Sequence, residues 1–417
     1  MVTELKVLQG AEQIGGNIIL INGNKSRIFL DFGIPLTDTN GNSADININN
    51  ADTDTPSLVR EVMIEGLKDT IVLISHAHPD HYGLLRYLDK NIPIYTSEIT
   101  KKLIETSSKI LYEDMFEDLN LVTITEPIET EEFIIECFPV NHSIGGASSF
   151  MITDKSSGKK ILYSGDLRCH GLNANDFGMN CNNADYMILE GTTLSRSDTN
   201  TKTEQDVEAE MNKVFKEDKL SIVCCSPLNQ DRFLSVYNAA KNQDKTLVID
   251  PYTALVLETY KNNSFPQYNC KNIKVYCADH PQTKKVFEDC KNLRFGRNKI
   301  SLEDIIKEPQ KYVIKHNAKI SEYILQKVNI EEINVIYSYW EGYLNKQNFW
   351  SKYRKYLKLI HTSGHIYEQD LILLVNKLNP KHIIPVHTLS NDRFKELFGG
   401  TRGKVLELHN GETLRIG

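Results

Sequence analysis

Four side chains able to bind a metal ion or carry a proton occur within the stretch ISHAHPDHYG, residues 74–83. His76, His78, Asp80 and His81 come directly after a short apolar run that is typical of a buried strand. Histidines at positions i and i+2 leave an extended backbone on the same side, so both imidazoles can reach one ion. One such residue alone would indicate an ordinary loop or a helix cap, but four together serve no purpose in packing. The stretch therefore predicts a metal-dependent hydrolase.

Further metal-binding side chains follow other predicted strands. His142 follows CFPVN, Asp166 follows ILYSG, and His387 follows HIIPV. Strand ends on one edge of a layered α/β fold lie together although they are distant in sequence, so we expect these residues to converge. Asp166 would bridge two ions. The first ion would be held by His76, His78, His142 and Asp166, and the second by Asp80, His81, Asp166 and His387.

The ligand types predict which metals fit. Imidazole and carboxylate groups without a thiolate suit zinc best, with manganese as the alternative. The eight cysteines are scattered, with no CxxC pair, so we do not expect them to bind zinc. Two such ions would hold a bridging water as hydroxide at neutral pH, a nucleophile suited to hydrolysis.

Strands and helices that could position these residues alternate along the chain, and its 417 residues suit two domains or one with an insertion. Residues 1–35 read as strands joined by turns, 36–55 as a polar loop of a length that is usually either disordered or used as a lid, and 56–67 as a helix. Between 203 and 350 the short apolar runs SIVCCS, KTLVID, NIKVYCA and INVIYS, separated by helices, predict a second, parallel α/β sheet. The last residues, 404–417, predict a hairpin that turns at Asn410-Gly411.

Composition and charge set limits on the protein class. A 40% hydrophobic and 25% charged composition is that of a soluble globular protein. No signal peptide and no apolar run of transmembrane length occurs, so we expect a cytoplasmic protein without membrane contact. The net charge of -7 argues against a surface that is basic throughout, although a local basic groove stays possible.

The order and spacing of these residues resemble the metallo-β-lactamase superfamily. Asp31 matches the first motif of that family, His76-x-His78-x-Asp80-His81 the second, His142 the third and Asp166 the fourth. Three later residues resemble the β-CASP branch, the nucleic-acid-processing nucleases that include ribonuclease J and the polyadenylation endonuclease. They are Glu190 in MILEGTTL, His365 in HTSGHIYEQDL and His387 in IIPVHT.

The resemblance implies an α/β fold, an αββα sandwich interrupted by an inserted β-CASP α/β domain. The first part of the metallo-β-lactamase domain would cover residues 1–195, the insertion 196–350, and the completing part 351–417. Because His387 lies close to the last residue, we expect a short form without the additional C-terminal domain of ribonuclease J.

The resemblance also implies roles for single residues. The expected function is a two-metal phosphodiesterase that cleaves single-stranded nucleic acid, with RNA favoured. Asp80 would bind metal and orient the attacking hydroxide, and His365, paired with Glu190, would donate the proton to the leaving oxygen. Asp31 would accept a hydrogen bond from the second ring nitrogen of a ligand histidine. Weaker signals suggest that Ser363, Gly364 and Arg232 contact phosphate.

Several alternatives remain open at this stage. The same branch contains DNA nucleases, and the same fold contains hydrolases of small thioesters or lactams as well as scaffolds that have lost their metals. Basic and aromatic residues alternate at 349–358 and 294–299, a composition suited to stacking bases but equally typical of solvated amphipathic segments. Exo- or endonucleolytic cleavage, its direction and a homo-oligomeric state are also possible and are not decided by the sequence.

Overall fold

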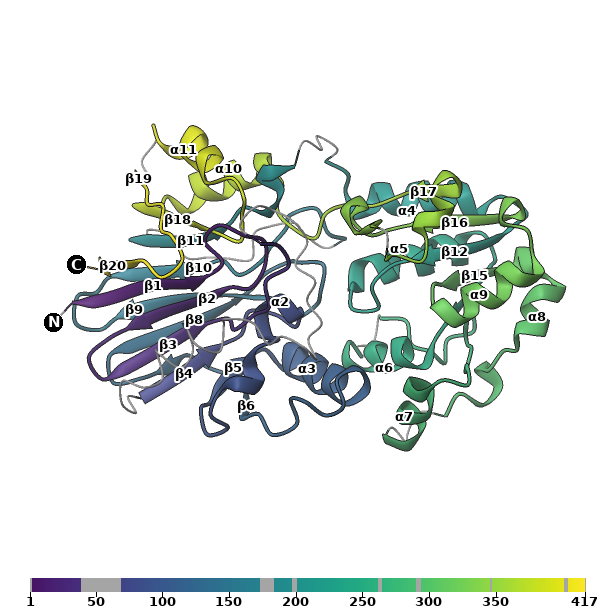
Figure 1. The fold of residues 1–417 in the computed structure, drawn as a ribbon, viewed down its shortest axis with the longest axis horizontal. Helices are drawn as coiled ribbons and strands as arrows, with labels where there is room; N and C mark the ends of the chain where they lie inside the picture. Colours follow the sequence, from purple (N-terminus) through teal and green to yellow (C-terminus); the bar gives the residue numbers. More distant parts are fainter. Residues whose placement is uncertain are drawn as a thin grey trace. The chain divides into compact units, whose positions relative to one another are not determined.

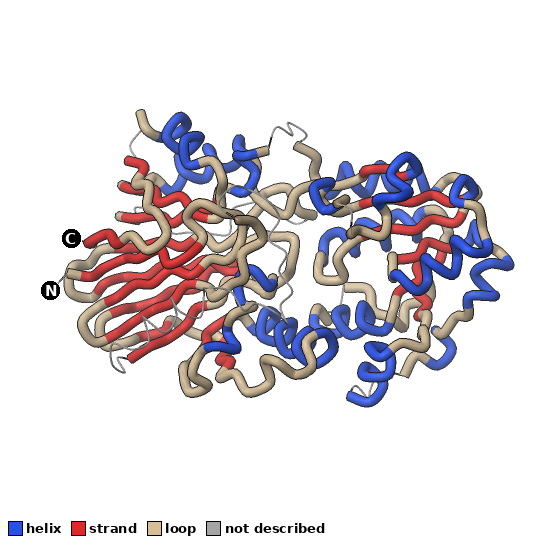
Figure 2. Tube along the Cα trace, in the orientation of Figure 1, coloured by secondary structure: helices blue, strands red, loops and turns tan. Residues whose placement is uncertain are grey.

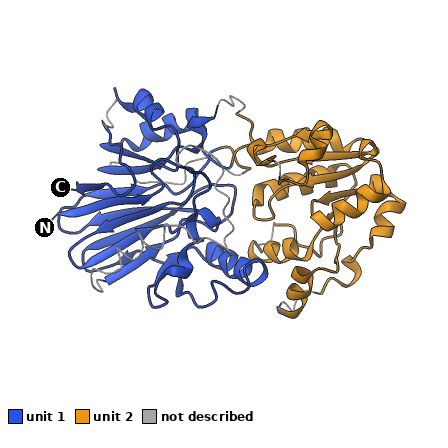
Figure 3. Cartoon of the chain, viewed as in Figure 1, with its two compact units in different colours: residues 1–169, 174–199, 364–417 blue, residues 170–173, 200–363 orange. Residues whose placement is uncertain are grey.

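The computed structural model describes residues 2–38, 69–172, 184–196, 201–261, 265–289, 294–345, 347–400 and 404–416. The chain forms two compact units (Figure 3). Unit 1 comprises residues 1–169, 174–199 and 364–417, and unit 2 comprises residues 170–173 and 200–363. The sequence places the domain boundaries at 196 and 350, so the second of these falls inside unit 2.

Unit 1 contains two seven-stranded sheets (Figures 1 and 2). From edge to edge, the first sheet consists of β20 (Thr413–Ile416), β1 (Thr3–Gln9), β2 (Ile18–Asn22), β3 (Ser26–Leu30), β4 (Asp69–Leu73), β5 (Ile94–Thr96) and β6 (Leu121–Thr123). The second consists of β19 (Lys404–Val405), β18 (His382–Val386), β11 (Tyr186–Glu190), β10 (Lys160–Tyr163), β9 (Ser148–Asp154), β8 (Phe133–Pro139) and β7 (Ile128–Glu129).

The two sheets of unit 1 pack face to face around one apolar core. Side chains of both sheets meet there, including Ile28 and Leu30 of β3 and Ile161 and Tyr163 of β10. Because successive strand residues point to opposite faces, Leu162 lies in a second cluster on the outer face of its sheet. Helices α10 (Glu368–Leu378) and α11 (Asn391–Phe398) contribute to that cluster and so cover this face.

A further layer, made of helices, lies beside the first sheet of unit 1. Helix α3 (Glu98–Leu111) begins at Ser97, whose side chain accepts a hydrogen bond from the Thr100 backbone N–H, and it buries Leu103 and Ile104. The short helix α2 (Pro79–Tyr82) follows β4. The αββα sandwich predicted for this part of the chain is confirmed.

Unit 2 is built on a six-stranded sheet in which every neighbouring pair of strands is parallel. Its order is β14 (Ile273–Val275), β13 (Thr246–Ile249), β15 (Tyr312–Lys315), β12 (Leu220–Cys224), β16 (Ile333–Tyr337) and β17 (Leu357–Leu359). Its helices are α4 (Glu204–Phe215), α5 (Gln230–Asn242), α6 (Pro251–Thr259), α7 (Pro281–Asp289), α8 (Leu302–Lys307) and α9 (Ala318–Lys327). The inner strands are buried and almost wholly apolar, as expected for a parallel sheet covered by helices on both faces.

Two parts of unit 2 differ from the expectation. The strand β15, with the sequence YVIK, is not recognisable from its short apolar run, yet it lies in the middle of the sheet between β13 and β12. β17 pairs with β16, which carries the sheet past residue 350 and explains why unit 2 extends to Ser363.

The predicted C-terminal hairpin is wrong. Gly411 does turn the chain, with φ of +89°, but the flanking strands do not pair with each other. β19 pairs in parallel with β18, and β20 pairs antiparallel with β1, so the two ends join different sheets of unit 1. The two separate sheets each offer an unpaired edge, and these partners replace the local pairing.

The predicted loop at 36–55 lies mostly outside the described residues, and the predicted helix at 56–67 lies wholly outside them. In the described part of the chain, no helix combines the length and apolarity that a transmembrane span requires.

Candidate metal centre

The expected metal ligands follow strands of both sheets in unit 1. The stretch with His76, His78, Asp80 and His81 follows β4 and runs into α2. The second sheet contributes the rest: β10, β11 and β18 are parallel neighbours, so their carboxyl ends meet at one edge. Asp166 follows β10, Glu190 ends β11, His387 follows β18, and His142 follows the antiparallel strand β8.

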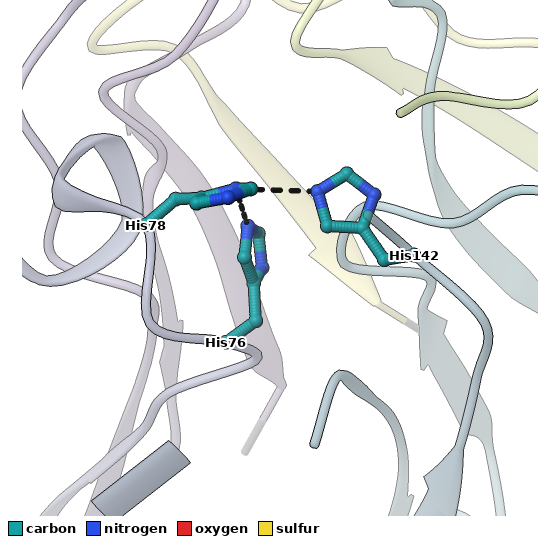
Figure 4. A group of neighbouring side chains, drawn as sticks. All are labelled: His76, His78 and His142. Atoms are coloured by element: carbon teal, nitrogen blue, oxygen red, sulfur yellow. Dashed lines mark hydrogen bonds between the residues drawn. The ribbon is translucent and has the colours of Figure 1, made fainter. Parts of the chain in front are cut away.

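Three histidines face one another at the first position (Figure 4). Nδ1 of His78 lies 3.0 Å from Nε2 of His76 and 3.2 Å from Nε2 of His142. Burial lowers the pKa of His76 and His142 well below the usual range and that of His78 to about 4. Neutral imidazoles offer the lone pairs that metal ions need, so this triad is suited to one ion.

A second group surrounds the carboxylate of Asp166. It consists of Asp80, His81, Asp166 and His387, all buried. Five histidine nitrogens lie within 3.1 to 3.9 Å of one Asp166 oxygen, Oδ2; they belong to His81, His365, His387, His76 and His142. Asp166 is thus the residue shared by both groups, the place where a bridging carboxylate belongs.

Three observations show that these residues fit divalent metal ions. Nitrogens of the His76, His78 and His142 imidazoles point at each other, although each neutral ring carries a single N–H to share. Among the described residues, His142 Nδ1 and Asp166 Oδ1 are buried without a hydrogen-bond partner, a cost that metal binding in the site would offset for the carboxylate. Burial disfavours a charge on His81, yet Asp166, Asp31 and Asp80 outweigh it and raise its pKa well above the usual range. The cluster therefore attracts positive charge.

Asp31 holds one of the presumed ligand residues in place through hydrogen bonds. Its Oδ2 lies 2.6 Å from Nδ1 of His81, the ring nitrogen opposite the one that faces Asp166. The same carboxylate accepts hydrogen bonds from the Ser75 backbone N–H and hydroxyl, at 2.7 Å each, and from the Tyr163 hydroxyl at 2.6 Å. Asp31 thus fixes the ring of a presumed ligand, the position expected for it from the sequence.

His387 is held in a left-handed backbone conformation. Its φ is +52°, an uncommon value for a residue with a side chain, and its backbone N–H donates to Gly10 C=O at 2.8 Å. Its Nδ1 lies 2.7 Å from the Thr192 hydroxyl and its Nε2 lies 3.2 Å from Asp80. These contacts set the ring orientation and aim Nε2 at the carboxylates.

His365 and Glu190 lie beside the second group. His365 Nδ1 lies 3.2 Å from Glu190 Oε2 and 3.5 Å from Asp166 Oδ2. Glu190 is fully buried and accepts hydrogen bonds from the backbone N–H groups of Leu167 and Thr192, each at 3.2 Å. Glu190 is therefore fixed, and the His365 side chain, 18% exposed, is in a position to face a substrate.

Comparison with known proteins places this geometry in a family. Residues 63–216 match the model of the beta-lactamase superfamily domain, and residues 355–404 match that of the Zn-dependent metallo-hydrolase RNA specificity domain. The second match contains His365 and His387. The chain belongs to the β-CASP branch of the metallo-β-lactamase superfamily.

Curated relatives of this β-CASP protein carry related names. Ribonuclease J of Helicobacter pylori is 22% identical over 413 residues, which are 91% of this chain but 55% of the relative. Ribonuclease J 2 of Streptococcus pyogenes is 24% identical over 92% of this chain and 70% of its own. The transcription termination factor FttA of Thermococcus kodakarensis is 34% identical over 100 residues, 23% of this chain. The chain thus spans about half the length of the Helicobacter relative.

A solved structure shares the whole fold. The crystal structure of a protein of unknown function from Enterococcus faecalis V583 covers 100% of both chains with a TM-score of 0.75 and 20% identity. This likeness supports the fold of the β-CASP protein and says nothing of its substrate.

The three expected phosphate contacts have different surroundings. Gly364 lies against the His142 loop, where an added Cβ would come within 2.8 Å of the Ser143 hydroxyl oxygen. Ser363 is buried, and its C=O lies 2.7 Å from His170 Nε2. Arg232 is fully buried, so the predicted phosphate contact is wrong.

Arg232 is fully buried inside unit 2 and cannot present its guanidinium to a substrate. It donates to both Glu204 oxygens at 3.0 Å, to the Ser338 C=O at 2.8 Å and to the Thr362 C=O at 3.2 Å. Its position at the start of a helix after a strand suggested a phosphate contact, but tertiary partners use its donors. Arg232 is therefore a structural residue of unit 2.

Sequence reasoning missed four residues of the site. Ser75, Tyr163 and Thr192 contact Asp31 or His387, and each lies within three residues of a recognised motif, which is the signal that could have found them. Arg168 is buried two residues after Asp166, and its Nε donates to the Asn141 side chain at 3.0 Å. Arg168 places a cation close enough to His142 to lower the pKa of that histidine, after the effects of burial, His78 and His365.

Proposed function

We propose that this β-CASP protein is a metal-dependent phosphodiesterase that hydrolyses single-stranded RNA. One observation carries the proposal: a histidine, His365, lies beside the metal centre, buried on its Nδ1 side against Glu190 and Asp166. Hydrolysis of a phosphodiester needs a proton donor for the leaving oxygen in addition to metal ligands. The match of residues 355–404 to an RNA specificity domain and the ribonuclease J relatives support RNA as the substrate.

Two divalent ions would be held by the groups described above. Zinc is our choice because the ligands are imidazole and carboxylate and because the matched family description is Zn-dependent; manganese is the alternative. When bound, such ions polarise the phosphate and provide a nucleophilic water at neutral pH.

The chain's own residues would carry out the remaining tasks. Glu190 accepts from the Leu167 and Thr192 backbone, so it is fixed and holds the His365 ring by Nδ1. The Glu190 carboxylate orients the His365 ring through Nδ1, and the proton on Nε2 would pass to the leaving oxygen. Asp80 lies 3.2 Å from His387 and 3.5 Å from His81, where it would accept a proton from the attacking water or bind metal.

The test measures cleavage of labelled oligomers. Zinc- or manganese-loaded protein is incubated with single-stranded RNA and DNA labelled at the 5′ or the 3′ end, with a thioester as a further substrate. We expect metal-dependent cleavage of RNA that is lost in the double variant Asp80→Ala, His81→Ala. Absence of cleavage of every oligomer would contradict the nuclease proposal, and faster cleavage of DNA than of RNA would contradict the choice of polymer.

A further inference from the structure

An aromatic and basic segment follows β16 in unit 2 (Figure 1). Residues 338–358, SYWEGYLNKQNFWSKYRKYLK, contain seven aromatic, five basic and one acidic residue, in a chain whose net charge is -7. Such a concentration of rings and cations is what proteins use to bind single-stranded nucleic acid. Only rings that face solvent could contact such a ligand.

The structure divides the rings into two groups. Trp350 is 2% exposed and joins the apolar core of unit 2 together with Leu344, and Phe349 and Tyr353 pack partly against the same core. Trp340 and Tyr343 are 39% and 47% exposed, among the most exposed large apolar side chains of the described residues. Trp350 is therefore a core residue, whereas Trp340 and Tyr343 present part of their surface to solvent.

The exposed pair is held in a defined geometry. A 3-10 turn, η6 (Glu341–Tyr343), joins the two residues, and the Tyr343 backbone N–H donates to the Trp340 C=O at 3.1 Å. The Asn348 side chain donates to the Tyr343 C=O at 3.0 Å. The two rings meet edge to face, with centroids 5.4 Å apart and planes at 88°.

Gly342 is needed for this arrangement. A Cβ at position 342 would lie 2.3 Å from two carbons of the Trp340 indole, so the ring rests on the glycine backbone. An indole fixed in this way loses little conformational freedom when a planar ligand stacks on it. The turn thus presents two exposed rings that are ordered before binding.

Lysines of the same segment lie over its other rings. Lys352 Nζ lies 5.0 Å from the ring centroids of both Phe349 and Tyr353, and Lys355 Nζ lies 4.6 Å from that of Tyr356. Arg354 pairs with Glu341, the acidic residue of the segment. A polyanion would therefore meet local positive charge on a protein that is acidic as a whole.

We propose that Trp340 and Tyr343 form a stacking platform for the bases of single-stranded RNA, with Lys352 and Lys355 of the same segment supplying positive charge for its phosphates. The inference rests on the proposed function and extends it by naming a substrate-binding surface in unit 2. Stacking uses the flat face that every base has, so the platform binds RNA without sequence preference.

The chain offers a direct optical test. Trp340 and Trp350 are its two tryptophans, one exposed and one buried. We would titrate the metal-loaded full chain with a short phosphorothioate-linked oligouridylate and, separately, with an abasic ribose-phosphate oligomer of equal length. Stacking predicts quenching of the exposed tryptophan by the oligouridylate and none by the abasic oligomer; equal quenching by both would overturn the platform.

Variants then link the platform to substrate binding. Trp340→Ala and Tyr343→Ala should each raise KM for RNA at least about fivefold with kcat unchanged. Gly342→Ala, which keeps both rings but displaces the indole, should raise KM in the same direction, and Trp340→Phe should restore most of the binding. Leu359→Ala is the matched control, because Leu359 is 46% exposed in the same unit but has no ring.

The failure of this inference can be told apart from the failure of the proposed function. An active enzyme whose KM is unchanged in both alanine variants overturns the platform alone. A wild-type protein that cleaves no oligomer overturns the proposed function. If that protein also binds the oligouridylate without quenching of tryptophan fluorescence, the platform is overturned as well. A change in solution mass, measured by light scattering, that accompanies the Trp340→Ala variant without a change in KM would mark the surface as a self-association site and also overturn the inference.

Discussion

His365 combines burial on one side of its ring with exposure on the other. Nδ1 is directed at Glu190 and Asp166, while the side chain remains 18% exposed. Since Nδ1 is occupied by carboxylates, the residue has little to offer as an additional metal ligand through that atom. The geometry separates the chemistry of His365 from that of the buried histidines.

The first prediction at the residue scale concerns this separation. His365→Ala should lower kcat for RNA about a hundred- to ten-thousand-fold, the usual contribution of a positioned proton donor. Its metal content, measured by atomic emission, should equal that of the wild type, because seven other side chains form two complete ligand groups and His365 belongs only to a third, with Asp166, Glu190 and His387. Loss of one metal equivalent in the variant would show instead that His365 is a ligand.

A second prediction concerns Asp31, which accepts from His81, Ser75 and Tyr163. Asp31→Asn keeps the size but loses the charge that orients His81. We expect metal affinity to fall about ten- to a hundredfold, measured by competition with a chelating dye. Asp154→Asn, at an acid of unit 1 that bonds Thr3 and Ser156 instead, is the control and should leave metal affinity unchanged.

At the scale of elements, the turn after β3 and the metal-binding stretch after β4 meet backbone to backbone. A Cβ at Gly33 would lie 1.6 Å from the Asp80 carbonyl oxygen and 2.6 Å from the His81 nitrogen. The Phe32 and Ile34 backbone N–H groups donate to His81 C=O and Pro79 C=O at 2.7 and 3.2 Å. The position of Asp80 and His81 therefore depends on a residue without a side chain.

Gly33→Ala tests this contact. Because two backbones cannot move apart without breaking these hydrogen bonds, the free energy of unfolding should fall by about 3 kcal/mol, with loss of metal binding. Urea unfolding followed by circular dichroism measures the first and metal analysis the second. Gly400→Ala, where no atom lies within 4 Å of the new Cβ, should behave as the wild type.

The stability of unit 2 should depend on pH through His316, which lies at the end of a strand. His316 follows β15, and burial, followed by the charge of Lys315, lowers its pKa to about 4, against the opposing effect of Asp250. The folded state thus favours the neutral ring. The part of the unfolding free energy that depends on a neutral His316 is fully present above the unfolded pKa of about 6.5. It falls as the pH drops from 6.5 to 4 and does not change further below pH 4.

We expect the wild type to lose up to about 3 kcal/mol of unfolding free energy over this window relative to His316→Gln. Trp350 is a suitable probe, since its ring centroid lies 5.3 Å from that of His316. Urea midpoints by tryptophan fluorescence at several pH values give the difference. Parallel pH profiles for the two proteins would contradict the assignment.

At the scale of the whole molecule, the metal centre and the tryptophans belong to different units. All presumed ligands, Glu190 and His365 are in unit 1, and Trp340 and Trp350 are in unit 2. Each unit has its own apolar core. We therefore expect metal to stabilise unit 1 without a matching effect on unit 2.

Chelation tests this independence. A ligand that binds only the folded state stabilises that state by about 4 kcal/mol when its free concentration is a thousand times its Kd. Adding zinc after chelation should raise the unfolding midpoint of one transition seen by circular dichroism, while the midpoint seen by tryptophan fluorescence stays unchanged. A common shift of both signals would show that the units unfold together.

The sequence by itself determined the class of fold and predicted the side chains that converge at the candidate metal centre. Ligand spacing in His76-x-His78-x-Asp80-His81 is a local property, and the polar residues that end apolar runs mark the edge where strands of a layered fold meet. Asp31, Glu190 and His365 could be named because each belongs to a short motif in a fixed order.

The tertiary structure decided what depends on distant partners. The strands at 404–405 and 413–416 look like a hairpin but pair with β18 and β1, because an open sheet edge competes with a local turn. Arg232 resembles a phosphate ligand until Glu204 and the Thr362 carbonyl are found to use its donors. Likewise Trp340 and Trp350 are alike in sequence, and only packing shows which one is buried and which is exposed. Such partners lie far apart in the chain, so residue type and spacing do not reveal them.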